Sequence, residues 1–230
     1  MTTKYQLSDL DKSIVIEPST PAQAAVIWLH GLGADGNDFV GLVPQLGLPV
    51  TQAVRFVFPN APVQPVSVNA GMNMRSWYDI YSMNIADKMD LASIALSSQV
   101  LEELIQEQID SGIATNNIVI AGFSQGGLVA INTALNTQHP LAGVMALSTY
   151  YPKACIQSLN QEINTSVPIL MAHGQTDPIV PFTVAQASKQ NLESLGCDVE
   201  WHEYAMEHQV CLSEIEMIAQ WLTSRLMLTN

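Results

Sequence analysis

A serine framed by glycines stands between two apolar runs of different character. Residues 122–127 read Gly-Phe-Ser-Gln-Gly-Gly, after the β-branched run Ile-Val-Ile-Ala and before Leu-Val-Ala-Ile. A strand, a Gly-x-Ser-x-Gly turn and a helix form a nucleophile elbow, which lifts the serine hydroxyl above the sheet. Ser124 is therefore the predicted nucleophile, and the Gln125 N–H at the helix start is a predicted donor to a developing oxyanion. A plain small-residue turn between strand and helix is the alternative.

An acid and a base for this serine are found further along the chain. A serine hydroxyl needs a base to accept its proton, and that base needs a third group to orient it. Asp177 follows a predicted strand in the segment His-Gly-Gln-Thr-Asp-Pro, and His208 lies between the last strand and the last helix. Both positions belong to the carboxyl edge of a parallel sheet, in the order serine, acid, histidine. We predict the triad Ser124–Asp177–His208, although Asp177 also fits a turn-initiating residue before proline.

The other acids and histidines beyond Ser124 occupy less suitable positions. His139 lies at the far end of the elbow helix, and His173 comes before the acid candidates in the chain. His202 lies inside a predicted strand, and Asp198 comes just before that strand. Glu203 and Glu207 lie too near His208 along the chain to orient it easily.

A glycine-rich segment follows a second buried strand. Residues 30–36 read His-Gly-Leu-Gly-Ala-Asp-Gly, directly after the apolar run 24–29. Dense glycine marks backbone that approaches another group closely. Leu32 N–H is therefore the predicted second oxyanion donor, beside that of Gln125. His30 fits either a brace for this loop or a histidine that is simply packed.

Residues 60–89 show no helical period and are rich in methionine and aromatic side chains. Such a long irregular segment is typical of a binding loop, and a small satellite core is the alternative. Apolar, compliant side chains here and just past Asp177 suit acyl chains. The predicted substrate-binding residues are Met72, Met74, Trp77, Ile179 and Val180.

Five blocks of this sequence together resemble the phospholipase/carboxylesterase family, which includes bacterial carboxylesterases and eukaryotic acyl-protein thioesterases. The resemblance runs from about residue 26 to residue 208, with the blocks in family order. It implies an α/β-hydrolase fold, the same triad and oxyanion donors, and hydrolysis of carboxylic esters. Glu207 is a departure, since many relatives carry glycine there. The blocks are His30-Gly-Leu-Gly33, Pro59-x-Ala-Pro62 with Met74-Arg-x-Trp-Tyr-Asp79, Gly122-Phe-Ser-Gln-Gly-Gly127, His173-Gly-x-x-Asp-Pro178, and His208.

The elements that must position these residues alternate between strand and helix. We expect one α/β domain over residues 1–230, with a doubly wound, mainly parallel sheet and helices on both faces. Only 19 residues, 148–166, separate the strand after the elbow helix from the strand before the acid. That interval already holds a predicted helix, so no cap domain is expected. The expected strands are 13–16, 24–29, 54–58, 118–121, 143–147, 167–172 and 199–204.

The charge composition of the chain limits the kinds of partner it can bind. The net charge of −13, from 21 acidic and 8 basic side chains, repels phosphate backbones and anionic lipids. Neither nucleic acid nor stable membrane association is expected, and the chain is either a monomer or a homodimer. The three cysteines lack metal-binding spacing, so reduced thiols are expected. With no signal-like leader at the start of the chain, a cytoplasmic location is predicted.

These features predict a serine carboxylesterase that hydrolyses short-to-medium acyl esters through an acyl-enzyme. Neither a metal nor another cofactor is required. The substrate is a small-molecule ester, or else an acylated protein or lysophospholipid. The alternatives are an acyl-protein thioesterase or lysophospholipase, which would use the same residues, and an inactive hydrolase-fold binding module.

Overall fold

The computed structural model describes residues 13–49, 53–82, 88–159 and 162–226. Its centre is a seven-stranded sheet with the strand order β1-β3-β2-β6-β7-β8-β9. Neighbouring strands run parallel except β1, which pairs antiparallel with β3. The strands are β1 (Ile14–Ile16), β2 (Ala24–Leu29), β3 (Val54–Phe58), β6 (Ile118–Phe123), β7 (Gly143–Leu147), β8 (Ile169–Gly174) and β9 (Val199–Tyr204).

The inner strands are continuous apolar runs because both faces of the sheet are covered. Every residue of β2, β7 and β8 is buried, as expected for parallel strands with helices on each side. Since these strands run in one direction, their carboxyl ends share one edge. The segments that follow β2, β6, β8 and β9 therefore meet there.

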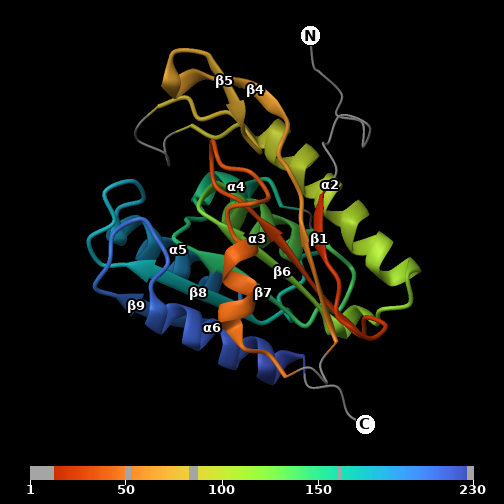
Figure 1. The fold of residues 1–230 in the computed structure, drawn as a ribbon. Coiled ribbons are helices and arrows are strands. Elements are labelled where there is room, and N and C mark those ends of the chain that lie inside the picture. The colour runs from red at the N-terminus through yellow and green to blue at the C-terminus, as the bar shows by residue number, and fades with distance from the viewer. Residues whose placement is uncertain (1–12, 50–52, 83–87, 160–161, 227–230) are drawn as a thin grey trace.

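Helices pack on the two faces in turn (Figure 1). Alternate residues of one strand face opposite layers: Ile27 and Ile120 lie in one core cluster, whereas Val26 and Val119 lie in the other. The first cluster contains side chains of α2 (Leu91–Asp110), α3 (Gln125–Asn136), α4 (Lys153–Gln157) and α5 (Phe182–Ser194); the second contains those of α1 (Val43–Leu46) and α6 (Leu212–Arg225). The predicted doubly wound, mainly parallel sheet is confirmed.

A hairpin occupies part of the segment for which no regular structure was expected. β4 (Val63–Val66) and β5 (Met72–Arg75) form a separate antiparallel pair, with Val63 opposite Arg75. It projects from one end of the main sheet (Figure 1). Each strand has four residues, mostly exposed or half-buried, so neither carries the apolar alternation that sequence reasoning relies on.

The connection between β7 and β8 is short. Within its described residues α4 is the only helix, in agreement with the absence of a cap domain expected there. β8 begins and ends two residues later than predicted, so His173 belongs to the strand.

Three further observations concern the part of the chain that the structure describes. Cys155, Cys197 and Cys211 are all free thiols. None of the described helices combines the length and apolar character needed to cross a bilayer. Within the same residues, no group of three or more acidic, histidine or cysteine side chains is arranged to hold a metal ion.

Candidate active site

The turn between β6 and α3 holds Ser124 in a conformation that non-glycine residues rarely adopt. Its φ is 53° and its ψ is −116°. The backbone is fixed on both sides, because Ser124 N–H donates to Leu147 O over 2.8 Å and Thr149 Oγ1 donates to Ser124 O over 2.6 Å. A Cβ on Gly122 would lie 2.2 Å from Gly126 backbone atoms. Only a residue without a side chain fits there, as a nucleophile elbow requires.

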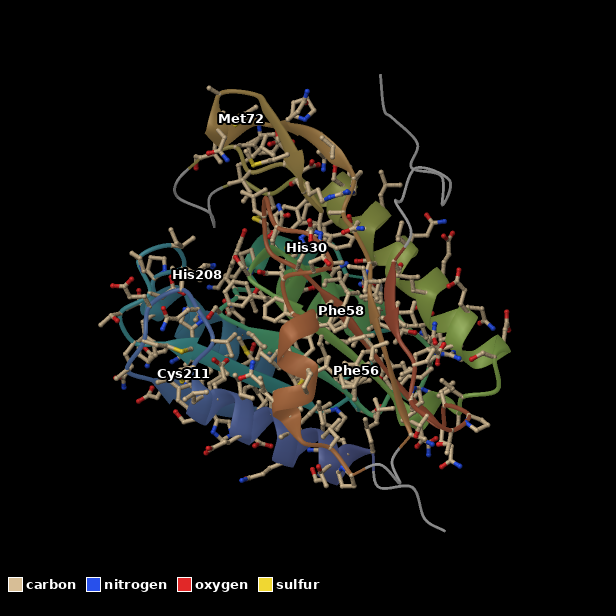
Figure 2. All side chains as sticks on the ribbon, in the orientation of Figure 1. His30, Phe56, Phe58, Met72, His208 and Cys211 are labelled. Carbon is tan, nitrogen blue, oxygen red and sulfur yellow. The ribbon has the colours of Figure 1, made fainter. Side chains whose placement is uncertain are left out.

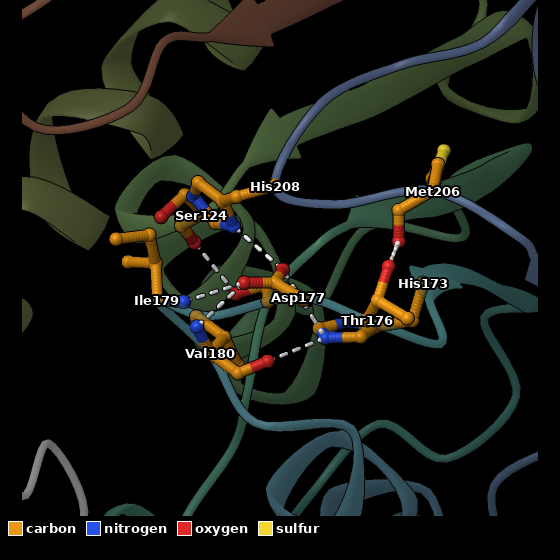
Figure 3. Close-up of polar contacts among 9 residues, drawn as sticks. Ser124, His173, Thr176, Asp177, Ile179, Val180, Met206 and His208 are labelled. Carbon is orange, nitrogen blue, oxygen red and sulfur yellow. Dashed lines mark hydrogen bonds and ion pairs between the residues drawn. The ribbon is translucent and has the colours of Figure 1, made fainter.

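Asp177 lies at the carboxyl end of β8 with its carboxylate fully paired (Figure 3). Oδ1 accepts hydrogen bonds from the backbone N–H groups of Ile179 and Val180, each 2.8 Å long. Oδ2 accepts from His208 Nδ1 over 2.6 Å. The carboxylate therefore has one orientation, with one oxygen committed to the backbone and the other to the imidazole.

Burial and hydrogen bonding shift the pKa of Asp177 in opposite directions. Burial raises the pKa, but the hydrogen bonds from His208, Val180 and Ile179 and the charge on His208 together bring it below its usual value. The group is thus held as a carboxylate although its side chain is shielded from solvent. This is the state that can orient and stabilise a neighbouring imidazolium.

Close backbone packing brings His208 to Ser124. Gly174 allows it, since a Cβ there would lie 2.4 Å from the carbonyl oxygens of Met206 and Glu207. The His208 ring packs on the ring of Phe123, the residue before the nucleophile, with centroids 4.8 Å apart. Because Nδ1 is used by Asp177, Nε2 is the nitrogen free to act as a base. Ser124 Oγ and His208 form no hydrogen bond here; such contacts often tighten only when substrate binds.

The glycine-rich loop after β2 lies against the elbow. A Cβ on Gly31 would lie 3.5 Å from Ser124 Cβ, and Gly33 N–H donates to Arg75 O over 2.8 Å. Among the described residues, the N–H groups of Leu32 and Gln125 have no hydrogen-bond acceptor. Two unused donors beside a serine are what an oxyanion site needs.

His30 braces this loop, which decides between the two predictions for it. Its Nε2 accepts the Ala61 N–H over 3.0 Å and its Nδ1 donates to Gly31 O over 2.7 Å. Trp77 Nε1 donates to the His30 carbonyl over 2.9 Å. Burial lowers the pKa of His30, consistent with a neutral, structural imidazole.

Two of the five predicted substrate walls are wrong. Trp77 and Val180 are each only 1 % exposed and belong to the core. Trp77 is held by its bond to His30, and Val180 uses its backbone to fix Asp177. For Trp77 the satellite-core alternative is therefore the correct one.

The other three predicted substrate-binding residues differ in how near they lie to the proposed triad. Met72 is 64 % exposed and lies on the hairpin, well away from His208 in Figure 2. Met74 is half-buried, with its sulfur 3.9 Å from the position of a Cβ on Gly33. Ile179 is 54 % exposed beside Asp177. Met74 and Ile179 are therefore better placed than Met72 to contact a substrate bound at Ser124.

Sequence reasoning missed the contacts by which two side chains hold the site together. His173 is buried and its Nε2 donates to Val180 O over 2.9 Å, 3.4 Å from Asp177 Oδ2; its spacing of four residues from the acid was the available signal. The Gln125 side chain accepts Trp77 N–H over 2.8 Å and donates to Tyr78 O over 2.7 Å. It ties the oxyanion turn to the base of the hairpin.

Comparisons with known proteins identify the family of this chain. The profile of the phospholipase/carboxylesterase family matches residues 10–226. The chain belongs to this family. Acyl-protein thioesterase 1 of Yarrowia lipolytica is 40 % identical over 212 residues, with 88 % of this chain and 93 % of the relative covered. Acyl-protein thioesterase 1 of Neurospora crassa is 37 % identical over 213 residues, covering 88 % and 87 %.

A solved structure with 29 % identity has the same architecture. The crystal structure of Arabidopsis thaliana SOBER1 aligns with a TM-score of 0.82 and 29 % identity, covering 89 % of this chain and 100 % of that one. The fold is the α/β-hydrolase fold, and the protein is a serine hydrolase of the carboxylesterase/thioesterase family.

Proposed function

We propose that this protein removes acyl groups from acylated proteins by hydrolysing thioesters and esters, with Ser124, His208 and Asp177 as its catalytic triad. The observation that carries this proposal is the 2.6 Å bond from His208 Nδ1 to Asp177 Oδ2, beside a serine in an elbow conformation. A hydroxyl, an oriented base and a buried carboxylate in this arrangement support acyl transfer.

In the first half-reaction, Ser124 Oγ attacks the acyl carbonyl and His208 Nε2 takes its proton. The Leu32 and Gln125 N–H groups bind the oxyanion of the tetrahedral intermediate. His208 then gives the proton to the departing sulfur or oxygen, which leaves an acyl-serine. Water attacks this ester with the same base, and the carboxylic acid departs. Asp177 holds the imidazole throughout and remains ionised.

One observation supports an acylated protein as substrate, and a second supports an acyl chain in general. The relatives at 37–40 % identity are named acyl-protein thioesterase 1. Beside the serine, Met74 and Ile179 offer apolar contact to an acyl chain. Short-to-medium carboxylic esters, which the sequence alone favours, remain a second substrate class for the same residues.

The test is a matched series of substrates. Chromogenic esters from acetyl to palmitoyl are assayed beside thioesters of the same acyl groups and an acylated cysteine peptide. We expect hydrolysis of the thioesters, including the peptide, at kcat/KM values comparable to those of the esters. Turnover of short esters with no measurable thioester hydrolysis would contradict the thioesterase assignment. A failure of Ser124 to react with a fluorophosphonate would contradict catalysis itself.

A further inference from the structure

A cleft lies on one side of the predicted catalytic histidine, with a volume of about 470 Å³. Its lining includes His208 and Phe123, the residue before Ser124. The 3₁₀ helix η2 (Val40–Leu42) and the residues just before it form the opposite wall. The other lining residues are Asp38, Phe39, Gly41, Leu42, Gln45, Gln209 and Val210.

The chemistry of the triad indicates which part of the substrate would lie in this cleft. An ester or thioester carbonyl carries the acyl chain on one side and the leaving group on the other. The base returns its proton to the leaving atom, so the leaving group must lie next to the imidazole. Met74 and Ile179, the two better-placed walls for an acyl chain, do not line this cleft. The cleft that shares His208 is therefore on the leaving-group side.

Its size and charge indicate the kind of leaving group. A volume of about 470 Å³ is far more than a small alcohol fills and falls in the usual range for ligand sites, about 300–1,000 Å³. Phe39, Leu42 and Val210 supply apolar contact. Among the described residues, Asp38 is the only acidic side chain in the lining, and apart from His208 no basic residue lines it.

A second carboxylate stands next to Asp38. Asp38 N–H donates to Asp35 O over 3.1 Å, so both belong to one turn. Asp38 is exposed, but partial desolvation, followed by the charge of Asp35, still raises the pKa of its carboxyl group. Its negative charge is therefore mildly unfavourable in this position. A positive group bound in the cleft would relieve that disadvantage.

We infer that this cleft binds the peptide segment that carries the acylated side chain, and that it selects a lysine or arginine next to the acylated residue. The inference rests on the proposed function, since it names the leaving group of that reaction. It makes Asp38 a specificity-determining residue that has no part in the bond-breaking steps.

The experiment uses four short peptides with one octanoyl group each. The acyl group is on cysteine or serine, and the neighbouring residue is lysine or glutamate. We expect kcat/KM to be about two- to fivefold higher for lysine than for glutamate, the range of an exposed ion pair. Each lysine-to-glutamate ratio of kcat/KM is divided by the lysine-to-glutamate ratio of the rates of alkaline hydrolysis without enzyme. This correction is needed because a neighbouring lysine also makes the thiol a better leaving group. The preference should shrink as salt rises.

Variants separate this cleft from general charge effects. Asp38→Asn should bring the lysine-to-glutamate ratio to about one. Asp198→Asn removes an equal charge from the opposite edge of the sheet, just before β9, and should leave the ratio unchanged. A Cβ on Gly41 has no atom within 4 Å among the described residues, so Gly41→Tyr can enter the cleft. It should lower kcat/KM for the peptides more than for an octanoyl ester of a small alcohol.

The outcomes distinguish the two proposals. Equal rates for the lysine and glutamate peptides, or a preference that survives Asp38→Asn, overturn the cleft assignment while the hydrolase function stands. Hydrolysis of the serine peptides alone overturns the thioesterase proposal, and the lysine preference is then read from those esters. No hydrolysis of any peptide overturns both.

Discussion

Ser124, the proposed nucleophile, lies in a strained backbone conformation. Its φ of 53° belongs to a class of conformations that costs about 1–3 kcal/mol per residue. The Leu147 and Thr149 hydrogen bonds and the missing side chain of Gly122 impose that conformation. The strain therefore comes from the turn and not from the hydroxyl.

Ser124→Ala should consequently fold normally and lose its activity. Alanine has the same Cβ and meets the same backbone strain, so the thermal midpoint should change little. Without the nucleophile, kcat should fall by about a thousandfold or more. Ester hydrolysis and thermal melting on the same preparation check both parts. A variant that keeps a tenth of the wild-type rate would show that Ser124 is not the nucleophile.

Two histidines near the end of the sheet should behave differently. His208 bonds Asp177, whereas His202 Nε2 lies 2.8 Å from Glu200 Oε1, away from the triad. His208→Ala should abolish acyl-enzyme formation, measured as the burst of product in the first turnover. His202→Ala should change kcat by only a small factor. The reverse ranking would mean that the base is misassigned.

Asp177→Asn tests the orienting role of the acid. The amide can still accept from Ile179 and Val180, so the loop should keep its shape. An amide next to Nδ1 favours the wrong imidazole tautomer, a change that costs about ten-thousandfold in kcat in serine proteases of the trypsin type. The loss should appear in kcat, with the urea midpoint nearly unchanged. Near-normal turnover would instead point to Glu203 or Glu207.

Helix α6 contains a buried carboxyl group that the proposed mechanism does not use. Glu214 is fully buried, and within the described part of the chain neither carboxyl oxygen has a hydrogen-bond partner. Burial raises its pKa to about 8. The folded state therefore keeps a proton that the unfolded chain releases near the ordinary glutamate pKa of about 4.3. Stability from this group is lost as pH rises from about 5 to 8.

Glu214→Gln should remove that dependence. The free energy of unfolding of the variant, relative to wild type, should rise by on the order of 3 kcal/mol between pH 5 and pH 8. Urea unfolding at several pH values measures it. Glu216→Gln, an exposed position on the same helix, serves as the control and should give a flat difference. A flat difference for Glu214→Gln as well would show that its carboxyl group is solvated in the folded state.

The predictable elements are those whose sequence pattern comes from burial. β2, β3 and β9 have the bounds expected, because apolar runs or strict alternation mark strands directly. The β4–β5 hairpin escaped prediction because its residues are mostly exposed and carry no such pattern. Trp77 was assigned to a groove since an aromatic side chain in a loop fits a wall as well as a core. Only its contact with His30, 47 positions away in sequence, decides.

The same limit applies to the supporting residues of the site. Ser124, Asp177 and His208 follow strands, so their common edge can be foreseen from topology alone. The contacts of His173 with Val180 and of the Gln125 side chain with Trp77 depend on how loops fold over that edge. A linear pattern contains no information on such contacts.

At the scale of the whole molecule, the short β7–β8 connection leaves the active-site edge without an inserted domain. We therefore expect that no inserted domain has to move before substrate reaches Ser124. Activity on monomeric esters should follow ordinary saturation kinetics, with no jump when the substrate passes its solubility limit. A titration of a medium-chain ester through that limit, with and without detergent, checks this. A sharp rise at the limit would reveal a lid among the loops.

The position of β9 at the edge of the sheet sets the order in which the enzyme becomes active. β9 pairs only with β8 in this sheet, and His208 follows it. A nascent chain on the ribosome thus displays the serine and its oxyanion loop while it still lacks the base. With His208 as the proposed base, hydrolysis requires that residue 208 has emerged and that the edge strand has docked. We therefore expect unfinished chains that lack residue 208 to be inactive.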